Sequence, residues 1–239
     1  MKFIHSLLLF ILFSTPLYAQ DVDLELVLLA DTTGSITDEE ISFQRKGYAD
    51  ALVSDGVLDA IRYTFTGKIA VTYVEWGDYR RQEVVVPWTI ISNKADAKAF
   101  TQQLHSVRRF AYGRNAIGAA LLKGKELIEK NNISAIRRVI DISGDSAISF
   151  NGPSIADARA QVLASNITIN GLPILCRNCK SKPTEPDLVE RYTDTIIGGS
   201  GAFVVTVESM DLFAAAVERK LILEISGKTP KETLAMTVK

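Results

Sequence analysis

Two acidic residues stand where apolar segments end, and small hydroxyl residues accompany each of them. Asp31 opens the string Asp-Thr-Thr-Gly-Ser, and Asp145 lies in Ser-Gly-Asp-Ser. Asn115 lies in a third polar segment, Tyr-Gly-Arg-Asn-Ala-Ile-Gly. Oxygen ligands of these types, with no His or Cys nearby, suit Mg²⁺, Mn²⁺ or Ca²⁺ better than zinc or copper. The residue types therefore predict a site for a hard divalent cation, with Mg²⁺ favoured.

The segments around these residues indicate the elements that position them. The run 22–30 is almost continuously apolar, which is typical of a parallel strand buried on both faces. Thr37 and Glu40 have the spacing of a capping box, so a helix should follow the polar loop. Further along the chain we expect a hairpin of strands at 68–76 and 82–88, helices at 93–106 and 116–130, a strand at 135–143, a helix at 153–165, strands at 167–175 and 202–207, and a helix at 211–225.

This alternation of strands and helices predicts an α/β fold. Its sheet should be open and mostly parallel, with one antiparallel edge strand and helices on both faces, as in Rossmann-like folds. Pro87 favours the edge position for the strand at 82–88, because proline cannot donate a hydrogen bond to a neighbouring strand. Ligands of such sheets bind beyond the carboxyl ends of the strands. We therefore expect the three polar segments to meet at that rim.

The first polar segment also resembles a known signature. Asp31-x-Thr33-x-Ser35 is similar to the Asp-x-Ser-x-Ser motif of the von Willebrand factor type A (vWA) domain, known as the metal-ion-dependent adhesion site. The predicted order of elements over about 22–226 resembles that superfamily as well. The strings VTYVEW, VIDISGD, ITINGLPI and IIGGSGAFV are similar to a secreted bacterial subfamily of unknown function within it.

The resemblance implies a metal-binding role for five residues. The hydroxyls of Thr33 and Ser35 and a side chain of the second loop, here Asn115, would hold the cation, while Asp31 and Asp145 would act mainly through water. One metal position stays open in the family for a carboxylate of the partner. The implied function is therefore binding of a protein that presents an acidic residue, without catalysis or a small-molecule substrate.

Two departures from the family pattern keep a second interpretation open. Thr33 replaces the usual Ser and retains the hydroxyl, whereas Asn115 replaces the usual Thr with a longer side chain. Arg114 places a positive charge beside the proposed cation, although it could instead pair with a carboxylate of the partner. The alternative is a structural or scaffold domain whose metal site is degenerate. Taken singly, Asp31 and Asp145 could also be simple helix caps.

An enzymatic alternative has less support. Asp-Thr-Thr-Gly-Ser also resembles the Asp-Lys-Thr-Gly-Thr loop of Mg²⁺-dependent phosphoryl-transfer enzymes, in which the residue equivalent to Asp31 is the nucleophile. Thr32 stands where that loop has Lys, and no second acid lies two residues after Asp31. Beyond the leader segment the chain has one histidine, His105, in a helical pattern, which disfavours a Ser-His-Asp triad. We therefore expect no enzyme.

Two further groups of residues could extend the site or stabilise the fold. Asp78, Tyr79 and Arg80 form the turn of the expected hairpin, and they either extend the partner-binding surface or form an ordinary exposed turn. Cys176 and Cys179 are the only cysteines. In an exported protein a disulfide is the favoured interpretation, ahead of free thiols, a redox pair or half of a zinc site.

The ends and the charge of the chain set its broad class. Residues 1–19 have the pattern of a signal peptide with cleavage after Ala19, so we expect an exported protein, periplasmic or secreted, with no membrane span. Residues 20–226 should form one vWA-like domain, and the Lys- and Thr-rich tail 227–239 has the composition of a disordered segment. The net charge of −1 argues against nucleic acid as a partner.

Overall fold

The structure is a computed structural model, and it describes residues 20–106, 108–175 and 185–230. The predicted signal peptide, Cys176, Cys179 and the tail from 231 onward lie outside these residues. Within them, no helix is both long enough and apolar enough to cross a membrane.

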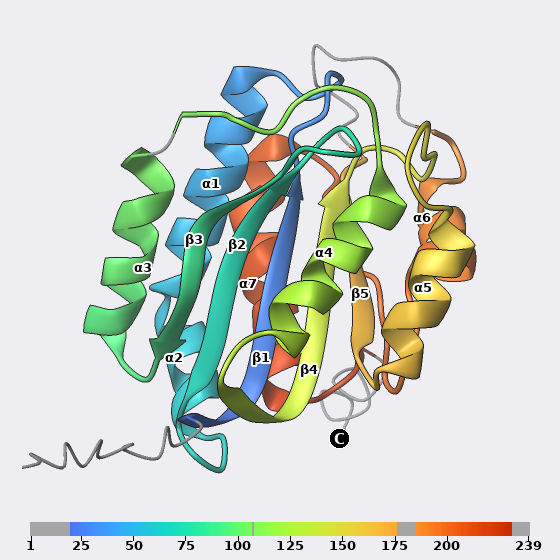
Figure 1. The fold of residues 1–239 in the computed structure, drawn as a ribbon. Coiled ribbons are helices and arrows are strands. Elements are labelled where there is room, and N and C mark those ends of the chain that lie inside the picture. Colours follow the sequence, from blue (N-terminus) through green and yellow to red (C-terminus); the bar gives the residue numbers. More distant parts are fainter. Residues whose placement is uncertain (1–19, 107, 176–184, 231–239) are drawn as a thin grey trace, which may run out of the picture.

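A five-stranded sheet forms the centre of the molecule, in the order β3-β2-β1-β4-β5 (Figure 1). Only the β2–β3 pair is antiparallel, which confirms the predicted hairpin and the edge position of its second strand. The strands are β1 Gln20–Asp31, β2 Ile69–Trp76, β3 Gln82–Ile91, β4 Ile133–Gly144 and β5 Thr168–Pro173.

Helices cover both faces of the sheet, as predicted (Figure 1). One face packs against α1 (Asp38–Leu52), α2 (Asp55–Arg62), α3 (Lys94–Ser106) and α7 (Phe213–Ser226). The other face packs against α4 (Ile117–Glu129), α5 (Ile155–Ala164), α6 (Leu188–Arg191) and a short π-helix, η1 (Tyr192–Ile196).

Local sequence signals explain where the strands and helices begin and end. Every residue of β1 from Val22 to Asp31 is buried, because β1 lies in the middle of the sheet with a helical layer on each side. At the start of α1, Thr37 accepts a hydrogen bond from the Glu40 N–H, and the Glu40 side chain accepts one from the Thr37 N–H. The capping box is thus confirmed, and it fixes the helix directly after the loop that carries Asp31.

The predicted strand at 202–207 is wrong. The chain there makes only isolated bridges, Gly171 to Val204 and Ile174 to Val207, and forms no ladder. Both bridges keep one register with β5, but Pro173 of β5 lies between them and has no N–H to donate, so the ladder is interrupted there. A short 3-10 turn, η2 (Met210–Leu212), precedes α7.

Candidate metal centre

The carboxyl end of β1 delivers Asp31 to the rim of the sheet. Asp31 is opposite Trp76 of β2, and the Thr32 N–H continues this pairing with a hydrogen bond of 2.9 Å to the Trp76 carbonyl. From the other side, the Gln44 side chain of α1 donates to the Asp31 carbonyl at 3.1 Å. The backbone is therefore held by both the sheet and the following helix.

The structure brings four of the five predicted ligands into one cluster. The Thr33 N–H donates to Asp31 Oδ1 at 2.8 Å, and the hydroxyls of Thr33 and Ser35 are 3.2 Å apart. The Ser35 hydroxyl donates to Asp145 Oδ1 at 3.0 Å, which links the β1 loop to the β4 loop across 110 residues of sequence. Thr33 and Asp31 are fully buried, whereas Ser35 is exposed and Asp145 is half-buried. The cluster therefore opens to solvent on the side of Ser35.

The loop that carries Asn115 is tied to the same region through backbone hydrogen bonds. The Gly34 N–H donates to the Gly113 carbonyl at 2.8 Å, which ties the loop before α4 to the Asp31 loop. Asn115 is buried, and its carbonyl accepts a hydrogen bond of 2.8 Å from the Phe150 N–H. Among the described residues, no hydrogen bond joins the Asn115 side chain to the other four.

Burial raises the pKa values of both carboxylates, and repulsion from Asp145 adds to the rise at Asp31. Removal from water, and then the charge of Asp145, raise the pKa of Asp31 to about 8, despite the lowering effect of the Thr33 N–H. Burial also raises the pKa of Asp145; the bond from Ser35 opposes this effect, and the charges of Glu40 and Glu185 add to it. Within the described part of the chain, neither carboxylate has an ion pair with Lys or Arg.

These residues fit a hard cation. Asp31 Oδ2 is buried and has no hydrogen-bond partner among the described residues, so a cation or a water bound to it would satisfy an oxygen that the protein leaves unpaired. Two carboxylates and two hydroxyls are oxygen donors of the kind that Mg²⁺ and Ca²⁺ prefer. In the same part of the chain, no group of three or more His, Cys, Asp or Glu could hold a metal.

Arg109 fixes the loop and was not singled out by the sequence. Its Nη2 donates to the carbonyls of Thr32 and Thr33 at 2.6 and 2.9 Å, and its Nη1 forms an ion pair of 2.8 Å with Asp38. Because Arg109 lies 76 residues from Thr33 in the chain, no local pattern could have predicted this contact. The Arg109 guanidinium therefore bonds to backbone carbonyls and to the Asp38 carboxylate.

The hairpin turn lies at the same rim, and its predicted residues differ in role. Asp78 is held from two sides: its N–H donates to the Tyr112 carbonyl at 2.9 Å, and the Asn151 side chain donates to its Oδ2 at 2.9 Å. It therefore joins three loops of the rim to one another. Tyr79 is 47% exposed and Arg80 is exposed, so both remain accessible to a partner.

Aromatic and arginine side chains pair around this rim. The Arg114 guanidinium lies 4.8 Å from the centroid of the Phe150 ring, and the Arg81 guanidinium lies 4.8 Å from that of Tyr112. Arg114 is exposed, and the two rings are about half exposed. Arg114 is therefore stacked on a ring of the β4–α5 loop and stays open to solvent.

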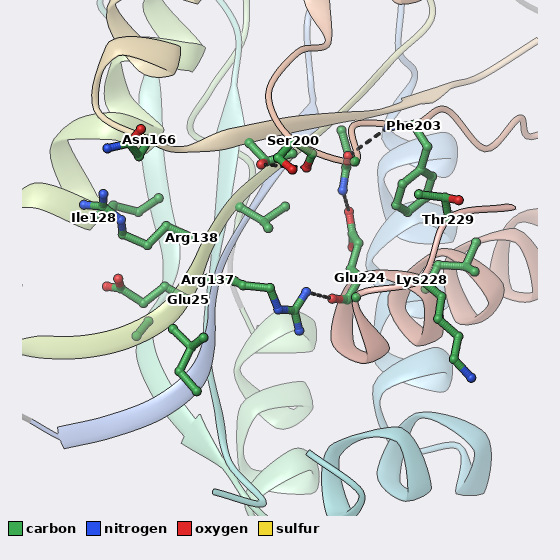
Figure 2. A pocket seen from close by; sticks show the side chains of 18 of the residues that line it. Glu25, Ile128, Arg137, Arg138, Asn166, Ser200, Phe203, Glu224, Lys228 and Thr229 are labelled. Atoms are coloured by element: carbon green, nitrogen blue, oxygen red, sulfur yellow. Dashed lines mark hydrogen bonds between the residues drawn. The ribbon is translucent and has the colours of Figure 1, made fainter. Parts of the chain in front are cut away.

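A cavity of about 830 Å³ is lined by residues of β4, β5 and the end of α7 (Figure 2). Its polar groups bond to one another: Arg137 donates to the carbonyls of Glu224 and Ile225, and the Asn170 amide donates to Glu224. These bonds hold the last turn of α7 against β4 and β5. The cavity is separate from the carboxylate cluster, and we assign it a structural role.

Solved structures share the fold at low sequence identity. A von Willebrand factor type A protein from Catenulispora acidiphila matches with a TM-score of 0.60 and 15% identity, over 85% of this chain and 43% of that one. Proximal thread matrix protein 1 from the mussel byssus, in a form with a zinc-occupied MIDAS motif, matches with a TM-score of 0.57 and 14% identity, over 85% and 46%. The vWF domain of the type V pili tip protein Mfa5 from Porphyromonas gingivalis matches with a TM-score of 0.55 and 8% identity, over 91% and 97%.

The chain covers 30%, 46% and 43% of the first three similar structures, so it corresponds to only part of each. A comparison with curated protein sequences gives no match. The sequence of residues 21–229, by contrast, matches one family over most of the chain. The fold is that of a vWA domain, and the chain belongs to the family described as "Protein of unknown function (DUF1194)".

Proposed function

We propose that this chain is an exported binding module that recognises an acidic group of a protein partner through a divalent cation. Asp31, Thr33, Ser35, Asn115 and Asp145 would hold the cation, and the partner's carboxylate would complete its coordination. The observation that carries the proposal is Asp31 Oδ2, a fully buried carboxylate oxygen that no donor among the described residues satisfies. It lies beside a second acid and two hydroxyls, where a cation would offset the repulsion.

The exposed rim supports a protein as the partner. Tyr79, Tyr112 and Phe150 are each about half exposed, and Arg80 and Arg114 stand among them. Aromatic residues and arginine are the types that contribute most to binding energy at protein interfaces. An arginine near the cation can also pair with a second acidic group of the partner. Asp78 would act indirectly, by fixing the turn that presents Tyr79 and Arg80.

The burial of Asp31 supports binding over phosphoryl transfer. A nucleophilic carboxylate must reach the phosphorus atom of its substrate, yet the Asp31 side chain is fully buried and one of its oxygens accepts the Thr33 N–H. The stronger competitor is a scaffold domain with a degenerate metal site. The lack of a hydrogen bond between the Asn115 side chain and the cluster, within the described residues, favours that alternative.

Thermal unfolding with and without metal tests the cation site. The mature protein would be unfolded in chelator and then with millimolar Mg²⁺, Mn²⁺ or Ca²⁺, as wild type, Asp145→Ala and Asp194→Ala. Asp194 is an exposed carboxylate of η1 and serves as the matched control. A metal at 100 times its dissociation constant stabilises by about 2.7 kcal/mol, which for a domain of this size raises Tm by roughly 5–10 °C.

We expect this rise in the wild type and in Asp194→Ala, and none in Asp145→Ala. No rise in the wild type at millimolar metal would contradict the cation site and favour the scaffold. Partner recognition is tested separately, by asking whether the immobilised protein retains proteins from an extracellular extract in Mg²⁺ and releases them in chelator. Retention that is equal in the wild type and Asp145→Ala would count against recognition through the metal.

A further inference from the structure

Tyr192 is a buried residue near the metal centre whose hydroxyl has no assigned role. It is the first residue of the π-helix η1, and its side chain is fully buried between the sheet and α5. Its hydroxyl has no hydrogen-bond partner among the described residues. A buried polar group without a partner costs about 1–3 kcal/mol, and π-helical turns are frequent at functional sites. Together the two features make this hydroxyl a candidate for a specific function.

Two glycines make room for Tyr192. A Cβ atom at Gly171 of β5 would lie 2.7 Å from the Tyr192 ring. A Cβ atom at Gly144, the last residue of β4, would lie 2.9 Å from the Tyr192 hydroxyl, 2.9 Å from Asp31 Oδ2 and 3.2 Å from Trp76. Neighbouring strands therefore lack side chains where the ring and its hydroxyl lie.

The Gly144 contacts also place two unpaired oxygens close together. Because Asp31 Oδ2 and the Tyr192 hydroxyl each lie 2.9 Å from the same point, their separation is no more than twice that distance. They are not hydrogen-bonded to each other directly. One water molecule with a hydrogen bond of about 2.8 Å on each side joins oxygens at such a separation. The two unpaired groups can thus satisfy each other.

The charges around Tyr192 keep its hydroxyl protonated. Burial, and then the charge of Asp31, raise the pKa of Tyr192 well above its ordinary value, and Asp145 contributes in the same direction. A protonated phenol donates a hydrogen bond and a carboxylate oxygen accepts one, so Tyr192 can act as the donor and Asp31 Oδ2 as the acceptor.

We propose that Tyr192 is a positioning residue of the metal centre, which donates through one buried water to Asp31 Oδ2 and fixes the orientation of that carboxylate. Asp31 is thereby held at both oxygens, by the Thr33 N–H at Oδ1 and by Tyr192 at Oδ2. Removal of a group that orients metal ligands typically weakens the binding of the metal by about 10- to 100-fold. The inference rests on the proposed cation site.

Two conservative substitutions test it. Tyr192→Phe removes only the hydroxyl. Tyr73→Phe is the matched control, because Tyr73 is also fully buried with an unpaired hydroxyl, but packs on the opposite face of the sheet against Tyr48. The dissociation constant for Mn²⁺ would be measured by titration calorimetry in both variants and in the wild type, together with Tm in chelator. We expect an affinity at least about 10-fold weaker in Tyr192→Phe and unchanged in Tyr73→Phe.

Tm in chelator separates positioning from a general effect on folding. Each substitution removes one hydroxyl and keeps the ring, so both metal-free variants should remain folded and unfold near the wild-type temperature. Equal Mn²⁺ affinity in Tyr192→Phe and the wild type would overturn the inference and leave the cation site intact. Equal weakening in both variants would also overturn it. Absence of Mn²⁺ binding in the wild type would overturn the proposed function and this inference together.

Discussion

The buried carboxylate of Asp31 should make the metal-free protein less stable as the pH rises. In the folded state the pKa of Asp31 is about 8, whereas its ordinary value is 3.8. The folded protein therefore holds a proton that the unfolded chain releases above pH 4. The stability that this group contributes is fully present below pH 4 and is lost as the pH rises through 8.

Asp31→Asn isolates this effect. The amide oxygen of Asn can still accept the Thr33 N–H, but the side chain has no charge to bury. Each pH unit between the two pKa values corresponds to about 1.4 kcal/mol, so the wild type should lose about 4 kcal/mol relative to the variant between pH 5 and pH 8. Asp141, whose pKa burial raises to about 7, is present in both proteins, so its contribution cancels in the comparison.

Urea unfolding in chelator, followed by circular dichroism at several pH values from 5 to 8, measures this difference. We expect the unfolding free energies of the two proteins to be closest at pH 5 and to diverge as the pH rises, with Asp31→Asn the more stable at pH 8. Saturating Mg²⁺ should restore much of the loss in the wild type only, because a cation favours the charged carboxylate. Parallel curves for the two proteins in chelator would refute the reasoning.

Three further substitutions test other parts of the structure by urea unfolding. Gly144→Ala should destabilise the fold by about 1–3 kcal/mol, because its Cβ would meet Asp31 and Tyr192; an unchanged midpoint would contradict the close packing. Lys220→Met should cost about 3–5 kcal/mol and more at pH 8 than at pH 5, because it leaves the buried Asp141 without its ion pair; a pH-independent loss would argue against that origin. Thr37→Ala should cost about 1 kcal/mol as a lost N-cap, and no change would contradict the role of the capping box.

Local patterns in the sequence predicted most of the fold. The apolar run of β1, the capping box at Thr37 and the hairpin with Pro87 are signals that neighbouring residues carry by themselves, and the structure confirms the sheet and the edge strand that follow from them. The short helix α2 was missed although it carries local signals, since Ser54 caps it and its buried residues Val57 and Ile61 lie four apart. The segment Leu188–Ile196 was missed because it has only one α-helical turn before the π-helix. The strand at 202–207 was overpredicted: the segment lies beside β5, but Pro173 interrupts the hydrogen bonds between them, so only isolated bridges form.

The sequence predicted only those residues of the candidate site that form a local motif or follow a buried strand. Asp31, Thr33 and Ser35 lie within one stretch of five residues, and Asp145 is recognisable because it directly follows a second buried strand. The contacts that hold the loop come from distant parts of the chain, such as the bonds from Arg109 to the carbonyls of Thr32 and Thr33. Such contacts follow from the packing of several elements, so neither residue type nor spacing reveals them.

The energetics of Asp31 support the proposed cation site over the scaffold alternative. A scaffold domain would be more stable with Asn at this position, because Asn keeps the bond to the Thr33 N–H and removes the buried charge. Among the described residues, Arg109 is bonded to carbonyls of the loop and to Asp38, and no Lys or Arg forms an ion pair with Asp31 or Asp145. The carboxylates therefore depend on a proton or a cation for compensation. A feature that lowers the stability of the metal-free fold is typical of a functional site, because stability and function are often in conflict there.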